Sequence, residues 1–83
     1  MQYEIEFKPK SIKDLKKIDR KYQKIILEKI EKLSYNMSGD IKKLTNFSPE
    51  YRMRIGIYRV LFEIENNNKI VIYSIVHRNS AYN

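Results

Sequence analysis

The sequence predicts an α+β fold, β-α-α-β-β-β, in which an N-terminal helical hairpin packs on one face of a mostly antiparallel four-stranded sheet. Residues 3–7, 51–55 and 58–65 alternate between apolar and polar side chains, as strands with one buried face do. Residues 11–33 instead repeat apolar side chains every three or four positions, which indicates amphipathic helices. The stretch 69–77 is apolar on both faces, which is typical of a central strand.

Length and composition limit the possible functions. The 83 residues are expected to form one domain, spanning residues 1–83. With no cysteine and one histidine, we expect no disulfide, no protein-only metal site and no cofactor. The formal net charge of +7 favours a polyanionic or acidic partner. No apolar run approaches the roughly 18 residues of a membrane span and no signal-peptide pattern is present, so we expect a cytoplasmic protein without a membrane partner.

A first strand is followed by a short helix. Tyr3, Ile5 and Phe7 form the apolar face of the strand, and Pro9 ends it. Ser11 is expected to be the N-cap of the helix. The carboxylate three residues later, Asp14, is expected to complement the helix dipole in the first turn.

A second helix is predicted from Asp19, which suits the N-cap position, to about Ser34. The two helical stretches form either a hairpin or one kinked helix, broken near Ile18-Asp19. Their charged side is expected to face solvent and their apolar side to cover the sheet. A loop follows, marked by Asn36, Ser38, Gly39 and Asp40.

The next two strands meet at the two-residue turn Gly56-Ile57. Glycine at the first position of such a turn predicts type II′, which places Arg54 directly opposite Arg59. Like charges so placed, with Cβ atoms about 4.5–5.5 Å apart, destabilise a sheet. A face that also carries Arg52 is therefore better explained by a polyanionic ligand than by stability alone.

The length of the turn at residues 66–68 decides which face of the sheet receives Arg78. An even loop puts Arg78 on the face of Arg59, whereas a three-residue loop without a bulge puts it on the opposite face. The sequence leaves both registers open. His77, one residue before Arg78, is expected to face the helices.

The remaining polar side chains suit one reaction. Neither a Gly-rich phosphate loop nor a supported Ser-His-Asp arrangement is present. Metal-free cleavage of RNA needs a base for the 2′-OH proton, cations for the phosphorane and an acid for the 5′-oxygen. Arginines bind phosphate in fixed geometry, and tyrosine can stack on a base or act as the general base. The candidates are Arg52, Arg54, Arg59, Arg78, His77 and Tyr82.

Three further assignments have alternatives. His77 is either a structural, hydrogen-bonded side chain or a catalytic acid. Lys42 and Lys43 either contact RNA phosphates beside the basic sheet or are ordinary surface lysines.

At these residues the chain resembles the RelE/ParE superfamily of toxins from bacterial and archaeal toxin–antitoxin systems. The resemblance covers nearly the whole chain and is most specific at residues 51–56, 58–64 and 77–82. RelE-type members enter the ribosomal A site and cut the mRNA there. The resemblance therefore implies a ribosome-dependent, metal-independent endoribonuclease, an mRNA interferase that inhibits translation.

The resemblance also implies roles for single residues. Arg59 and Arg78 would contact the scissile phosphate. Arg52 and Arg54 would contact phosphates and stabilise charge in the transition state. Tyr82 would be the general base or a stacking platform. Family members often carry lysines where this chain has Arg52 and Arg54, and a permanently protonated arginine cannot supply a neutral amine base.

Two other functions fit the same sequence. ParE-like toxins share the fold and the Tyr-Arg strand but inhibit DNA gyrase, and a basic RNA-binding module would bind RNA without cutting it. Either toxin function implies an acidic cognate antitoxin as a partner. The nuclease function adds the ribosome and mRNA.

Overall fold

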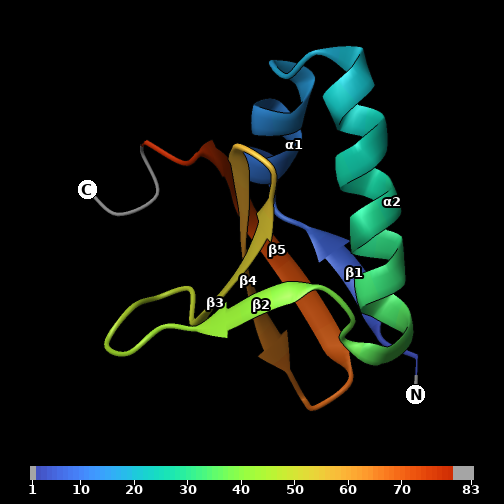
Figure 1. Cartoon of the computed structure of the whole chain (residues 1–83). Helices are drawn as coiled ribbons and strands as arrows, with labels where there is room; N and C mark the ends of the chain where they lie inside the picture. The colour runs from blue at the N-terminus through green and yellow to red at the C-terminus, as the bar shows by residue number, and fades with distance from the viewer. Residues whose placement is uncertain (1, 80–83) are drawn as a thin grey trace.

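The computed structural model describes residues 2–79. Helices and strands follow one another as shown in Figure 1. They are β1 Glu4–Phe7, α1 Pro9–Lys16, α2 Arg20–Asn36, β2 Asp40–Lys43, β3 Tyr51–Ile55, β4 Tyr58–Glu65 and β5 Lys69–His77. No helix in this part of the chain is both long and apolar enough to cross a membrane. Tyr82 falls outside the described residues.

The strands form one sheet in the order β1-β5-β4-β3-β2. β1 runs parallel to β5, and the other neighbouring strands are antiparallel. α2 lies along one face of this sheet (Figure 1). Residues 17–19 are not helical and connect α1 to α2. The predicted α+β class, with its helical pair on one face, is confirmed.

The predicted number of strands is wrong, because β2 adds a fifth strand at the edge of the sheet. β2 pairs antiparallel with β3 over its whole length, from Asp40 opposite Arg54 to Lys43 opposite Tyr51. Three of its four residues are charged, so it lacks the apolar alternation that marks a strand in a sequence. Short, charged strands are common at sheet edges, where they discourage pairing with other chains.

Helix α1 begins three residues earlier than predicted, so Ser11 is not its N-cap. Pro9 occupies the first turn, where its fixed φ and missing N–H are tolerated, and Lys8 is the N-cap residue. Ser11 is fully buried inside the helix and donates its hydroxyl to the carbonyl oxygen of Lys8 at 2.7 Å. The intrinsic preference of proline for the first turn outweighed the capping preference of serine.

Asp14 likewise has a different role from the one predicted. It lies beyond the first turn of α1, and its Oδ2 accepts a hydrogen bond from the backbone N–H of Ile75 at 3.0 Å. The same oxygen forms an ion pair with Lys10 at 3.0 Å. Asp14 therefore attaches α1 to β5.

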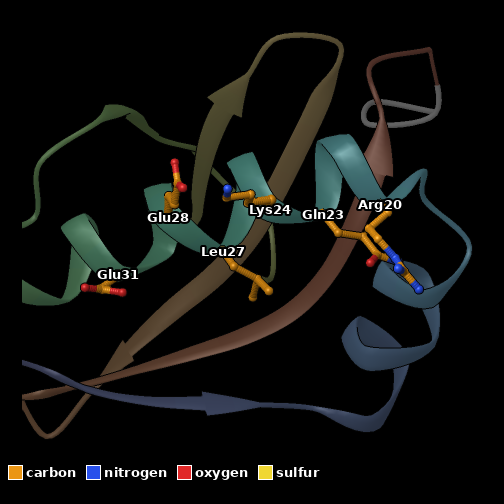
Figure 2. A pocket seen from close by; sticks show the side chains of 6 residues that line it. All are labelled: Arg20, Gln23, Lys24, Leu27, Glu28 and Glu31. Atoms are coloured by element: carbon orange, nitrogen blue, oxygen red, sulfur yellow. The ribbon is translucent and has the colours of Figure 1, made fainter.

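Helix α2 starts and ends close to the predicted positions. Asp19 is its N-cap residue, although the carboxylate makes no capping hydrogen bond, and Met37 closes the helix in the left-handed conformation with φ of 58°. A groove of about 320 Å³ runs along one exposed flank of this helix (Figure 2). Its lining residues are Arg20, Gln23, Lys24, Leu27, Glu28 and Glu31.

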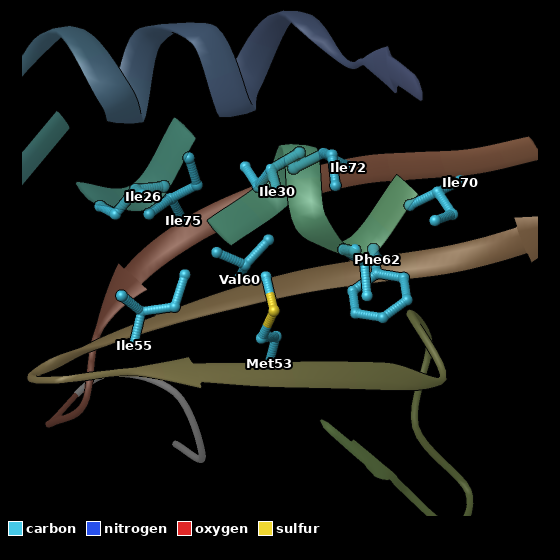
Figure 3. Close-up of a cluster of buried hydrophobic side chains, with 10 residues drawn as sticks. Ile26, Ile30, Met53, Ile55, Val60, Phe62, Ile70, Ile72 and Ile75 are labelled. Carbon is cyan, nitrogen blue, oxygen red and sulfur yellow. The ribbon is translucent and has the colours of Figure 1, made fainter. Parts of the chain in front are cut away.

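The hydrophobic core lies between α2 and the sheet (Figure 3). Ile26 and Leu33 of α2 and Val60 and Phe62 of β4 have no solvent exposure. The ring of Phe62 also stacks on that of Tyr51, with the centroids 5.4 Å apart. The sheet is thus covered on one face by an apolar layer, and its opposite face is available to other side chains.

The pairing of β4 with β5 shows which face of the sheet carries Arg78, a question that the sequence left open. Glu65 pairs with Lys69, so the turn has three residues. A bulge between Leu61 and Phe62 then shifts the pairing by one residue, so that Arg59 lies opposite Val76. Because side chains two positions apart share a face, this bulge restores Arg78 to the face of Arg59.

Candidate functional site

The hairpin of β3 and β4 has the predicted geometry. Gly56 has a positive φ of 56°, whereas Ile57 is not among the residues with positive φ, as a type II′ turn requires. Arg54 and Arg59 are direct cross-strand partners. The sheet therefore places two like charges opposite each other on its uncovered face, beside the turn.

Cross-strand pairing arranges this face in two rows. One row runs across the strands through Asp40, Arg54, Arg59 and Val76. The adjacent row runs through Lys42, Arg52, Leu61 and Ser74. We use the name arginine face for the surface formed by Lys42, Arg52, Arg54, Arg59 and Arg78.

Arg59 lies at the centre of the arginine face and is held by the turn. Its Nη1 donates to the carbonyl oxygens of Gly56 at 2.8 Å and Tyr58 at 2.9 Å. Among the described residues, its Nε and Nη2 make no hydrogen bond, and these two atoms form an edge suited to bidentate phosphate binding. The turn thus orients this guanidinium group and leaves one edge for a ligand.

The surroundings of Arg59 are strongly positive. Burial lowers the pKa of its guanidinium, and the charges of Arg52, Arg54 and Arg78 lower it further, while Asp40 acts in the opposite direction. An arginine nevertheless stays protonated near neutral pH. The charges of the three other arginines therefore act on Arg59, and an anion bound beside Arg59 would relieve this repulsion.

Arg78 reaches this group from the end of β5. Its backbone N–H donates to the carbonyl oxygen of Ile57 at 2.7 Å, which ties the segment after β5 to the turn between β3 and β4. The two ends of the candidate site, distant in sequence, are joined by this hydrogen bond.

Arg54 has an acidic partner that the sequence analysis did not identify. The Oδ2 atom of Asp40 accepts from Nε of Arg54 at 2.7 Å and lies 2.6 Å from its Nη2. Asp40 was predicted only as part of a loop, because the pairing of β2 with β3 is a tertiary feature. The one available signal was an isolated carboxylate two residues before the basic pair Lys42 and Lys43.

The structure separates Lys43 from the arginine face. Lys43 pairs with Tyr51 and so lies on the core side of β2, with its Nζ 6.0 Å from the ring centroid of Tyr51 and 4.0 Å from the carboxylate of Glu50. Its neighbour Lys42 lies opposite Arg52. Of the two lysines, only Lys42 is positioned to join the arginines.

His77 also lies on the core side, opposite Tyr58. Its ring meets that of Tyr58 edge-on with the centroids 6.1 Å apart, and its Nδ1 accepts a hydrogen bond from the backbone N–H of Asn79 at 3.2 Å. These contacts support the structural interpretation of His77.

The arginine face is an open surface, distinct from the groove on α2 (Figure 2), which contains none of its residues. Across residues 2–79, no group of three or more carboxylate or imidazole side chains gathers in a way that could hold a metal ion. The chemistry that the face can offer is the binding of phosphate groups and the stabilisation of added negative charge.

Known proteins resemble this chain in sequence. The profile of the family described as "ParE toxin of type II toxin-antitoxin system, parDE" matches residues 5–82. Toxin RelE3 of Methanocaldococcus jannaschii is 34% identical over 76 residues, which cover 86% of this chain and 85% of the relative.

Solved structures share the fold. The toxin–antitoxin complex RelB-RelE from Methanococcus jannaschii contains a chain that is 32% identical, with a TM-score of 0.76 and coverage of 93% of this chain and 94% of that one. The RelE-RelB complex from Pyrococcus horikoshii OT3 contains a chain that is 25% identical, with a TM-score of 0.78 and coverage of 98% and 100%. Both matches extend over nearly the whole length of each chain.

Proposed function

This chain belongs to the RelE/ParE superfamily of toxins from type II toxin–antitoxin systems, and we propose that it is a ribosome-dependent endoribonuclease that cuts mRNA in the A site. The observation that carries the proposal is the arginine face. Arg54 and Arg59 are held opposite each other, although like charges so placed lower stability. A polyanionic substrate accounts for this arrangement.

In the proposed reaction, the 2′-oxygen of the substrate attacks the adjacent phosphorus as a base takes its proton. The P–O5′ bond breaks and the 5′-oxygen gains a proton, which leaves a 2′,3′-cyclic phosphate and a 5′-hydroxyl. The phosphorane between these steps carries more negative charge than the diester, so arginines that contact it lower the barrier. Arg59 and Arg78 are proposed to bind the scissile phosphate, and Arg52 and Arg54 to bind neighbouring phosphates and stabilise the transition state.

Tyr82 is proposed as the general base or as a platform on which a base of the mRNA stacks. A phenol close to several arginines would have a lowered pKa, because the positive charges favour its deprotonated form. The substrate must carry a 2′-OH, so the enzyme would act on RNA and not on DNA. The proposed site of action is the ribosome in the cytoplasm.

An antitoxin is the second proposed partner. The related chains from M. jannaschii and P. horikoshii were solved in complex with RelB. With a net charge of +7, this chain would bind an acidic antitoxin favourably, and coverage of the arginine face would block RNA.

One finding favours a second candidate function. The matching family profile carries the description "ParE toxin of type II toxin-antitoxin system, parDE". Under this alternative the chain would inhibit DNA gyrase, and supercoiling assays with the purified protein would detect the inhibition directly.

The experiment that tests the nuclease proposal maps the 5′ ends of a reporter mRNA in a translating extract. We expect new ends at a fixed position within codons when wild-type protein is added, and their loss for Arg59→Ala combined with Arg78→Ala. An absence of new ends with the folded wild-type protein would contradict the proposal. The same would hold if the double variant produced cuts at the wild-type rate.

A further inference from the structure

Asp40 contacts Arg54 in a way that leaves part of the arginine available. One carboxylate oxygen, Oδ2, binds the side of the guanidinium group formed by Nε and Nη2, at 2.7 and 2.6 Å. Within residues 2–79, Nη1 of Arg54 makes no hydrogen bond. An arginine has five N–H donors, so Arg54 keeps donors for a phosphate while one edge stays fixed.

The place of Asp40 in the sheet matters as much as its distance. It is the first residue of β2 and lies directly opposite Arg54, which in turn lies opposite Arg59. The carboxylate thus stands at one end of a row of charges, on the side of Arg54 away from Arg59. Its attraction draws the Arg54 guanidinium away from that of Arg59 and offsets part of their repulsion.

We propose that Asp40 is a positioning residue, which fixes the guanidinium group of Arg54 so that its remaining donors face a phosphate held between Arg54 and Arg59. The effect of Asp40 on mRNA cleavage rests on the proposed function. Its effect on the binding of RNA to the arginine face does not, because binding to a free oligonucleotide requires no cleavage.

Two consequences follow for a variant without the carboxylate. Asp40→Asn removes one negative charge beside the arginines and replaces the ion pair with Arg54 by, at most, a weaker hydrogen bond to a neutral amide. Binding of RNA should therefore become tighter at low salt and depend more steeply on salt. Cleavage should become slower, since the more weakly held Arg54 no longer keeps one orientation in the transition state. A residue that only stabilised the fold would not raise affinity while lowering the rate.

Glu50 provides a matched control. Its side chain is 51% exposed, compared with 55% for Asp40, and Glu50→Gln changes the net charge by the same amount. Its ionic partner is Lys43, which lies on the core side of β2. A change in RNA affinity that both substitutions share is due to net charge. Any additional change in Asp40→Asn is due to the position of Asp40 beside Arg54.

The test is a double-mutant cycle with a fluorescein-labelled 12-nucleotide oligouridylate as the probe. We expect Asp40→Asn to bind it about threefold more tightly than Glu50→Gln at low salt, the effect of making the unit charge of Arg54 available to a phosphate about 6 Å away in water. In the Arg54→Ala background this excess should become smaller, because only the direct repulsion between the Asp40 carboxylate and the RNA remains. On translating ribosomes, Asp40→Asn should cut mRNA about tenfold more slowly than wild type. Thermal unfolding of each variant checks that it is folded, and Asp40→Glu, which keeps the charge, should bind like wild type.

Equal affinities of Asp40→Asn and Glu50→Gln in the wild-type background would overturn the proposal. So would an excess effect of Asp40→Asn that persists unchanged in the Arg54→Ala background, because Asp40 would then act independently of Arg54. If the wild-type protein cuts no mRNA on ribosomes, the proposed function fails, while the binding cycle still decides the role of Asp40.

Discussion

The two faces of the sheet are built from the same strands but meet different requirements. On the core face, Met53 is 1% exposed and Phe62 is fully buried, and both pack into one apolar layer with α2. On the arginine face, the neighbouring residue Arg54 has a side chain that is 58% exposed and lies opposite another arginine. The alternation of a β-strand allows one segment to serve both faces.

The difference indicates where stability and function are separated in this molecule. Substitutions on the core face should change the free energy of unfolding, because they remove buried apolar contacts. Substitutions on the arginine face should change RNA binding and alter the free energy of unfolding by less than about 1 kcal/mol, since charges at the surface contribute little to folding. The four predictions below test this separation, starting with the largest expected effect.

The largest effect is expected for Phe62→Ala. The side chain is fully buried and stacks on Tyr51, so its truncation leaves a cavity and should cost about 3–5 kcal/mol of unfolding free energy. Urea unfolding followed by circular dichroism measures this change, and Phe62→Leu should cost less. A loss below about 1 kcal/mol would show that the site collapses around the smaller side chain, contrary to a tightly packed core face.

Asp14→Ala should cost less than Phe62→Ala, about 1–3 kcal/mol, because the N–H of Ile75 would lose its acceptor. Amide hydrogen exchange at Ile75 should accelerate in the same variant. Asp14→Asn keeps an oxygen acceptor, so its free energy of unfolding should lie between those of Asp14→Ala and wild type. Unchanged exchange at Ile75 would mean that Asp14 does not attach α1 to β5 in solution.

Lys42 and Lys43 provide a direct comparison of the two faces, since they are adjacent in sequence. Lys42→Ala should weaken binding of a single-stranded RNA and reduce the slope of log affinity against log salt by about 0.7, the value for one lost phosphate contact. Lys43→Ala removes the same charge from the core side of β2 and should leave the slope unchanged. Equal slopes for the two variants would contradict the assignment of Lys42 to the arginine face.

The smallest effect concerns an ion pair at the edge strand. Nζ of Lys69 lies 2.6 Å from Oε1 of Glu6, and a hydrogen bond and the charge of Lys69 lower the pKa of Glu6 below its usual value near 4.5. The hydrogen bond and charge of Glu6 raise the pKa of Lys69 above its usual value near 10.5.

A lowered carboxyl pKa stabilises the fold above the unfolded pKa and ceases to do so as pH falls through the folded value. A raised ammonium pKa stabilises below the unfolded pKa and ceases to do so as pH rises through the folded value. The pair should therefore contribute from about pH 5 to pH 10 and be lost at both extremes. The test compares the free energy of unfolding of Glu6→Gln with that of wild type from pH 3 to pH 11. A difference between the two proteins that stays constant at all pH values would contradict the prediction.

The sequence determines the local features of the site more completely than the distant ones. The type II′ turn at Gly56 and the pairing of Arg54 with Arg59 were predictable, because a two-residue turn fixes the register of the strands around it. The side of the sheet that receives Arg78 was not predictable, because it depends on a bulge in the pairing of β4 with β5.

The remaining differences have similar causes. Strand β2 has no apolar period and exists because β3 offers it an edge, so neither the fifth strand nor the partnership of Asp40 with Arg54 was visible in the sequence. At the start of α1, Pro9 and Ser11 carried competing signals, and the structure uses proline in the first turn. Tertiary pairing decided the first case, and a local competition decided the second.

Under the proposed function, the arginine face serves RNA cleavage and not stability. The most direct test measures both properties in Arg59→Ala combined with Arg78→Ala: the rate of mRNA cleavage on translating ribosomes and the free energy of unfolding. We predict at least a hundredfold loss in the cleavage rate, as for the loss of transition-state charge stabilisation in other enzymes, with unfolding changed by less than about 1 kcal/mol. Cleavage at the wild-type rate by the folded double variant would contradict the account.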